Sequence, residues 1–232
     1  MKFSLVIPCY NEAKNIPLLL ERCAVFNGRD DFEIILVDNG STDDSLEVFK
    51  ELVPQYPSCK IVRVEENQGY GFGILSGLRE AQGDVIGWTH ADMQTDPQDV
   101  LQAVDFFKET PTGAFAKGKR YGRPFLDVVF TIGMSVFETF FLKKTMWDIN
   151  AQPTLFSKEF FNSWTEPPHD FSLDLYAYYQ AHIHKLKIFR FSVRFGERAH
   201  GSSHWNVNWS AKKKFIHRTL LFSLELKEKL NK

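Results

Sequence analysis

Cysteine is scarce in this sequence, and no two cysteines lie close together. The three in 232 residues are Cys9, Cys23 and Cys59, and none belongs to a Cys-x-x-Cys pair. An odd, widely spaced set argues against a disulfide framework and is typical of free thiols in a reducing compartment. We therefore expect a cytoplasmic location.

Long apolar runs and excess charge are also lacking. The start of the chain (MKFSLVIPCYNEAKN) soon turns polar, unlike a secretory signal. No run approaches the ~18 apolar residues that a membrane-spanning helix needs, so we expect no transmembrane helix. The formal net charge is −1, which gives no reason to expect a nucleic-acid partner.

The first half of the chain alternates between strand and helix patterns. Hydrophobic residues make up 44% and charged residues 25%, as in ordinary globular proteins. Predicted strands cover residues 2–8, 32–38, 60–66, 84–90 and 113–120, with helices at 11–26, 41–53, 71–83 and 97–110 between them. Such alternation predicts an α/β fold with a mainly parallel, Rossmann-like central sheet and helices on both faces.

The second half is less regular. Residues 123–144 and 169–184 are predicted helices, 185–195 a strand, and 148–157 an extended segment. Residues 196–206 form a polar loop, and 209–232 fit an amphipathic helix.

Polar clusters follow each of the first four predicted strands: CYNE, DNGSTDD, ENQGYG and HADMQ. Parallel sheets bind ligands beyond the carboxyl ends of their strands, so these clusters predict one shared site. In the last cluster His90, Asp92 and Gln94 are two residues apart and can face the same side of an extended chain. A carboxylate and an amide oxygen suit Mg²⁺ or Mn²⁺. The alternative is a polar turn before the next helix.

Other polar residues have two interpretations as well. Asp38 ends a strand and can accept hydrogen bonds from a base or ribose, or it belongs to a turn built by Asn39 and Gly40. Gly71, with Gly69 and Gly73, allows close backbone approach to a ligand or to a neighbouring strand. Candidate phosphate-binding groups in the second half are Arg120, Arg123, Arg198 and Ser202. The alternative for any single arginine is a surface ion pair.

The combined stretches VIPCYNE, VDNGSTDDS, ENQGYGFGILSG, AQGDVIGWTHADMQTDP, GKR, INAQPTLFS and FGERAHGSSHWN resemble the family-2 glycosyltransferases of GT-A fold. The closer resemblance is to the dolichol-phosphate mannosyltransferase-like, polyprenyl-phosphate branch. It implies one domain over 1–232, with a nucleotide-sugar-binding half (1–122) and an acceptor and membrane half with C-terminal helices (123–232).

The resemblance also implies residue roles and an activity. Nucleotide binding falls to Pro8, Tyr10, Glu12, Asp38, Asn67, Gly71, Ala91 and Asp92. Asp92, Gln94 and His90 would hold Mg²⁺ or Mn²⁺, and Arg120, Arg123, Arg198 and Ser202 the acceptor phosphate, with Asp92 and Arg120 as the catalytic residues. The expected reaction is inverting, metal-dependent transfer from a UDP- or GDP-sugar to a polyprenyl or dolichyl phosphate.

Two departures keep alternatives open. His90 replaces the first acid of the usual Asp-x-Asp motif, which leaves the metal undecided. Asp127 stands where the branch commonly has a serine, four residues after Arg123. A saccharide hydroxyl is therefore an alternative acceptor, with Asp127 or His90 as base. A non-catalytic nucleotide-sugar-binding protein is a further alternative.

The Phe-rich stretch 125–144, which ends in Lys143 and Lys144, fits the headgroup region of a membrane. We expect a peripheral protein at the inner face of the membrane. Core packing, a homo-oligomer contact or a membrane-protein partner are the alternatives for this stretch.

Overall fold

The computed structural model describes residues 1–201, 217 and 219–226. Over these residues the core is a seven-stranded sheet of order β3-β2-β1-β4-β6-β5-β7. The strands are β1 (Phe3–Cys9), β2 (Phe32–Asn39), β3 (Cys59–Val64), β4 (Val85–Trp88), β5 (Ala114–Tyr121), β6 (Thr154–Ser157) and β7 (Lys187–Arg194). Strand β6 runs antiparallel to β4 and β5, and the other pairs are parallel, so the predicted mainly parallel sheet is confirmed.

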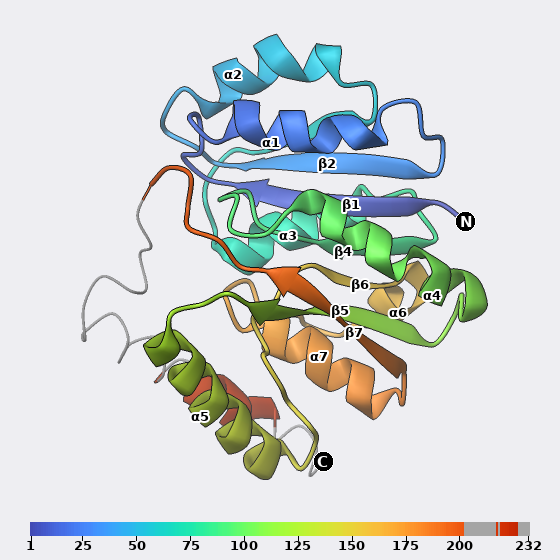
Figure 1. The fold of residues 1–232 in the computed structure, drawn as a ribbon, viewed down its shortest axis with the longest axis vertical. Coiled ribbons are helices and arrows are strands. Elements are labelled where there is room, and N and C mark those ends of the chain that lie inside the picture. The colour runs from blue at the N-terminus through green and yellow to red at the C-terminus, as the bar shows by residue number, and fades with distance from the viewer. Residues whose placement is uncertain (202–216, 218, 227–232) are drawn as a thin grey trace.

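Helices cover both faces of the sheet, as predicted (Figure 1). One face packs against α1 (Ile16–Cys23), α2 (Ser45–Leu52), η3 (Pro97–Ala103) and α4 (Val104–Glu109). The other packs against α3 (Tyr70–Arg79), α6 (Lys158–Asn162) and α7 (Leu173–Ile183). Strand β1 alternates accordingly: Leu5 and Ile7 join the first core cluster and Val6 the second. Two short 3₁₀ turns, η1 (Ala24–Phe26) and η2 (Val53–Gln55), complete the first half.

The helix predicted at 97–110 forms in two parts. Asp96 caps it by accepting a hydrogen bond from the backbone N–H of Gln98, and Pro97 opens it, as expected. Its first part, η3, is a 3₁₀ helix whose buried residues are Pro97, Val100 and Ala103. A spacing of three residues matches the 3₁₀ period, so this turn winds tighter than an α-helix to keep its apolar side on the sheet.

Strand order reverses between β1 and β4, and the four polar clusters all lie beyond the carboxyl ends of β1 to β4. Such a switch point is where open α/β sheets bind ligands. Glycine makes the sheet tight here: a Cβ on Gly87 would lie 2.0 Å from the backbone oxygen of Thr154 on β6.

Helix α5 (Phe125–Leu142) stands away from the sheet, beside the helical residues 219–226 (Figure 1). Its 18 residues have a mean hydropathy of 1.7 and are only 17% buried, so by length and composition it could cross a membrane. The sequence prediction that no run approaches this length was wrong for α5. The helix accommodates two acidic residues. Asp127 lies in its first turn, and Glu138 is buried and accepts a hydrogen bond from Ser223.

Candidate functional site

The loop after β4 brings Asp92 into a buried position beside another chain segment. Asp92 is 5% exposed, and its Oδ1 accepts the backbone N–H of Gln94 at 3.1 Å. The intervening Met93 has a φ of +61°, a left-handed conformation that turns the chain sharply. The other oxygen, Oδ2, lies 2.8 Å from Nη2 of Arg198. The side-chain amide of Gln94 donates to the backbone oxygen of Gly196 at 3.2 Å.

His90 is half-buried and lies against an aromatic ring. Its ring stacks on Tyr70 with centroids 5.7 Å apart, and Tyr70 stacks on Phe171 at 4.6 Å. Burial lowers the pKa of His90, although the neighbouring Asp92 and Asp174 act in the opposite direction. The imidazole is therefore held neutral near pH 7, the form in which a histidine can bind a metal.

The loops after β1 and β2 hold the predicted nucleotide-side residues. Pro8 pairs with Val37 in the sheet, and Tyr10 is 42% exposed. Glu12 receives a hydrogen bond from Asn15, and burial raises its pKa, with the charge of Asp92 adding to the effect. Glu12 thus lies within electrostatic range of the β4 loop.

Asp38 and Asn67 are both engaged by the protein itself. Asp38 is fully buried, with one oxygen accepting from the backbone of Ser41 at 3.0 Å and the other paired with Arg63. Asn67 accepts from the backbone N–H of Gly69 at 2.9 Å. These contacts fix the loops after β2 and β3, and base or ribose binding by Asp38 stays a prediction.

Gly71 lies under another loop of the protein. A Cβ at this position would lie 2.6 Å from the backbone oxygen of Pro168 and 2.7 Å from that of Asp170. The glycine therefore allows residues 168–170 to cross the start of α3 closely. Ala91, next to the β4 loop acids, is 4% exposed. A nucleotide contact at either residue stays a prediction.

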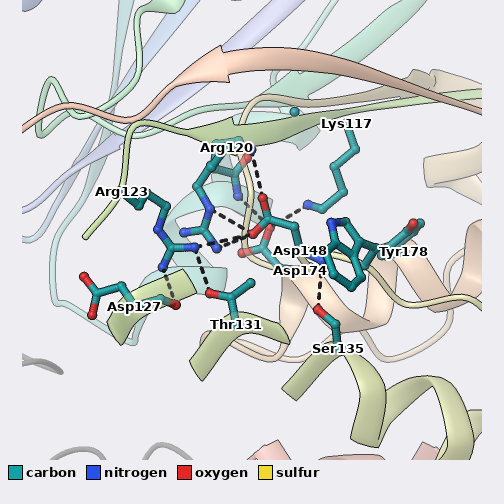
Figure 2. A network of polar contacts seen from close by, with 12 residues as sticks. Lys117, Arg120, Arg123, Asp127, Thr131, Ser135, Asp148, Asp174 and Tyr178 are labelled. Atoms are coloured by element: carbon teal, nitrogen blue, oxygen red, sulfur yellow. Dashed lines mark hydrogen bonds and ion pairs between the residues drawn. The ribbon is translucent and has the colours of Figure 1, made fainter. Parts of the chain in front are cut away.

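Arg120 and Arg123 meet at one carboxylate beyond the end of β5 (Figure 2). Arg120 donates to Asp148 from its backbone N–H and from Nε, each at 2.9 Å, and also from Nη2. Nη1 of Arg123 lies 3.9 Å from the same carboxylate. Asp148 is held in turn by its own backbone N–H, which donates to Ser135 on α5 at 3.0 Å. Burial acts to raise the pKa of Asp148, but the charge and hydrogen bonds of Arg120 outweigh it and lower the pKa.

Arg123 forms its ion pair with Asp148 and not with Asp127. Burial lowers the pKa of Arg123, although the charge of Asp127 acts to raise it. Arg123 donates to Thr131 Oγ1 at 2.7 Å and to the backbone oxygen of Asp127 at 3.4 Å, while the Asp127 carboxylate points away from the cluster (Figure 2). The Nε atom of Arg123 is buried and has no hydrogen-bond partner among the described residues. The Phe195 ring lies 5.2 Å from the guanidinium of Arg120 and 5.5 Å from that of Arg123. The arginine side chains are 9% and 6% exposed, so two buried cations share Asp148.

A buried ion pair that the sequence analysis missed, Lys117–Asp174, lies next to this cluster (Figure 2). Lys117 on β5 is fully buried and donates to Thr154 Oγ1 at 2.9 Å and to Asp174 Oδ1 at 3.4 Å. Gln152 also donates to Asp174, and at 3.4 Å to the Tyr70 hydroxyl. Burial lowers the pKa of Lys117 to about 8. This network extends to Tyr70, whose ring stacks on His90.

The structure therefore brings most predicted residues to one edge but divides them differently. His90 is within electrostatic range of Asp92, Arg120 and Arg198. Arg198, which the sequence analysis grouped with Arg120 and Arg123, contacts Asp92 instead. Ser202 lies outside the described residues.

The donor set fits a hard divalent cation only if other oxygens complete the shell. In residues 1–201, 217 and 219–226 no group of three or more His, Cys, Asp or Glu side chains could hold a metal. Asp92, with Gln94 and His90 nearby, matches a Mg²⁺ or Mn²⁺ ion that keeps waters and takes further ligands from a diphosphate.

The family model for "Glycosyl transferase family 2" matches residues 4–165. The chain belongs to that family. The match includes β1 to β6, the β4 loop and the Arg120–Asp148 pair.

Two curated relatives align with part of this family-2 chain. The undecaprenyl-phosphate 4-deoxy-4-formamido-L-arabinose transferase of Photorhabdus laumondii is 38% identical over 107 residues, covering 44% of this chain and 33% of the relative. The dolichol-phosphate mannosyltransferase of Pyrococcus furiosus is 33% identical over 121 residues, covering 52% and 34%. The aligned part thus spans about a third of each relative.

Solved structures show that this family-2 chain has the GT-A fold. Glucosyl-3-phosphoglycerate synthase from Mycobacterium tuberculosis, in complex with Mn²⁺, UDP and glucosyl-3-phosphoglycerate, matches with a TM-score of 0.72 at 18% identity, covering 96% of this chain and 79% of that one. A mannosyltransferase from Pyrobaculum calidifontis, in complex with GDP-mannose and Mn²⁺, matches with a TM-score of 0.66 at 20% identity, covering 86% and 58%.

Proposed function

We propose that this chain catalyses inverting, metal-dependent transfer of a sugar from a UDP- or GDP-sugar to a polyprenyl phosphate. The observation that carries the proposal is the Arg120–Asp148–Arg123 cluster. Two guanidinium groups that are nearly buried share one carboxylate, so the cluster keeps a net positive charge and an unpaired donor, Arg123 Nε. An anionic phosphate oxygen offers the acceptor that such a site lacks.

The two halves of the chain divide the work. Residues 1–122 bind the donor, with Pro8, Tyr10, Glu12, Asp38, Asn67, Gly71 and Ala91 on the nucleotide side. Asp92, Gln94 and His90 would hold Mg²⁺ or Mn²⁺, which offsets negative charge on the diphosphate. Residues 123–232, together with Arg120 at the end of β5, bind the acceptor. The Mn²⁺ with UDP or GDP-mannose in the solved complexes of similar fold supports a metal-assisted nucleotide site.

A phosphate acceptor needs no general base, whereas a hydroxyl acceptor would need one such as His90, which lies within electrostatic range of Arg120. A phosphate oxygen is already anionic, so it attacks the anomeric carbon without losing a proton. The new bond forms on one face of the sugar as the bond to the diphosphate breaks on the other, which inverts the centre. The Asp127 carboxylate, a candidate base for a hydroxyl acceptor, points away from the cluster (Figure 2).

Helix α5 gives the acceptor a plausible route from a membrane. Phe125 and Leu126 in its first turn are each 78% exposed, and Phe140 near its end is 81% exposed. Arg123 lies two residues before the helix begins. An apolar helix that starts beside a phosphate-binding pair fits a protein bound peripherally at the cytoplasmic face, with lipid tails against α5 and headgroups near the arginines.

The test is transfer of label from nucleotide sugars to undecaprenyl phosphate in phosphatidylethanolamine–phosphatidylglycerol vesicles with Mn²⁺. We expect the unaltered chain to give labelled product that partitions into butanol. Asp92→Asn should retain at most about 1% of that rate, because a key charge contact is lost. Asp99→Asn, on η3, is the matched control and keeps full activity. Label that stays in water as a glycan, or activity retained in Asp92→Asn, contradicts the proposal.

A further inference from the structure

A single short segment contacts the loops after β1 and β4 and the end of β5. Residues 195–200, called the strap here, leave β7 and run toward the loop after β1 (Figure 1). The backbone N–H of Phe195 donates to Tyr121 at 2.9 Å, and that of Gly196 donates to Gln94 at 2.8 Å. At the far end, Asn15 donates to the backbone oxygen of His200 at 3.3 Å.

Within the strap, Arg198 contacts Asp92 Oδ2, the carboxylate oxygen that a divalent metal ion would need. Its Nη2 lies 2.8 Å from Asp92 Oδ2, while Asp92 Oδ1 is engaged by the backbone of Gln94. A divalent ion on Oδ2 and the guanidinium would repel each other and compete for this oxygen.

The contact leaves Arg198 incompletely satisfied. Its Nε is buried and has no hydrogen-bond partner within the described part of the chain. A buried donor without a partner costs free energy, and diphosphate oxygens are strong acceptors for a guanidinium. The Arg198 side chain is 27% exposed against 7% for the side chain of Asp92, so the arginine is the partner with room to move.

We propose that the strap is a latch in which Arg198 substitutes for the metal on Asp92 until a metal–diphosphate complex displaces it. This inference rests on the donor site of the proposed function. On displacement, Arg198 turns from the carboxylate to the diphosphate and stabilises the leaving group. The enzyme therefore binds the metal poorly by itself and well together with the donor.

The latch also reaches the acceptor arginines. Phe195 lies three residues before Arg198, and its ring contacts the guanidinium groups of both Arg120 and Arg123. Movement of the strap on donor binding would shift this ring. Donor binding is then felt at the acceptor phosphate site, and the donor is favoured as the first substrate.

The experiment measures Mn²⁺ binding to the full chain by the electron paramagnetic resonance signal of free Mn²⁺. Arg198→Ala removes a partly exposed ion pair that competes with the metal for Asp92. This variant should therefore bind Mn²⁺ alone about five- to tenfold more tightly than the unaltered chain. The same variant should bind Mn²⁺ with UDP or GDP about tenfold more weakly, because a charged donor to the diphosphate is lost. Arg198→Lys, which keeps the charge, should bind Mn²⁺ alone like the unaltered chain.

Arg194→Ala removes an exposed arginine at the end of β7, next to the strap, and should change neither affinity. Equal affinity for Mn²⁺ alone in Arg198→Ala and the unaltered chain overturns the latch, as does undetectable binding in both. Failure of UDP and GDP to bind with Mn²⁺ contradicts the proposed donor site instead, so the two failures are distinguishable.

Discussion

Asp148→Asn tests whether the two buried arginines form an anion site. Asp148 is 3% exposed and has a φ of +49°, a left-handed conformation that asparagine adopts readily. The substitution therefore removes the charge while the backbone, including the hydrogen bond to Ser135, can stay in place. Arg120 and Arg123 then face each other without a shared carboxylate.

The cost follows from the burial of the pair. Removing one partner of a buried ion pair costs about 3–5 kcal/mol, because it leaves an uncompensated charge. Asparagine still offers an oxygen to Arg120, which favours the lower end, about 3 kcal/mol. For a chain of 232 residues this corresponds to a melting temperature about 6–12 °C lower.

The distinguishing result is recovery by phosphate. An anion bound between the arginines replaces the missing carboxylate, and at about 100 times its Kd it stabilises by about 2.7 kcal/mol. Thermal unfolding with and without inorganic phosphate, at constant ionic strength set by chloride, measures this. The control is Asp105→Asn: Asp105 is 89% exposed beside Lys108, so its loss should stay within about 0.5 kcal/mol and show no extra phosphate effect.

Two outcomes would refute the reasoning. A loss below about 1 kcal/mol in Asp148→Asn would mean that the arginines do not depend on the carboxylate. Equal stabilisation of Asp148→Asn and the unaltered chain by phosphate would mean that the anion does not take the place of the Asp148 carboxylate between the arginines.

Three further substitutions test the buried groups around the site. In the folded chain the pKa of Lys117 is about 8, below its unfolded value. Between pH 8 and about 10.4 the unfolded chain therefore binds more protons, and the free energy of unfolding rises with pH by up to about 3 kcal/mol. Urea unfolding of Lys117→Met should lack that rise. Burial raises the pKa of Glu138 to about 7, so stability falls as pH rises from about 4.3 to 7, and Glu138→Gln should be the more stable form at pH 8, whereas equal stability would contradict this. Gly71→Ala should lose at least about 2 kcal/mol in urea unfolding, because its Cβ meets the backbone of Pro168 and Asp170; a neutral result would show that this loop yields easily.

The fold could largely be predicted from the sequence, because its determinants are local. Apolar runs such as 32–38 specify strands, and Asp96 with Pro97 specifies a helix start. The place of β6 could not be predicted, because a four-residue strand carries little pattern and its antiparallel pairing with β4 and β5 depends on distant partners. The extent of α5 was predicted well, as residues 123–144, but its apolar length was discounted because Glu138 is charged, and the contact with Ser223 explains how the helix accommodates that acid.

At the site, the sequence predicted the positions that follow strands but not their partners. Asp92 and Arg120 stood out as polar residues at strand ends. Asp148 and Asp174 did not, because they lie in an irregular segment and in a helix, and their roles come from Arg120 and Lys117 packed against them. Arg198 was placed with the wrong neighbours, since its pairing with Asp92 joins residues 106 positions apart. One signal was present: a buried lysine or arginine in a strand implies an acid elsewhere.

The most direct measurement compares undecaprenyl phosphate with undecaprenol as acceptor, in the same vesicles and with the same nucleotide sugar. The unaltered chain should transfer sugar to the phosphate and give no product with the alcohol, and Arg123→Gln should lose at least about 100-fold with the phosphate. Equal transfer to the alcohol, or full activity in Arg123→Gln, would contradict the assignment of the arginine pair to the acceptor phosphate.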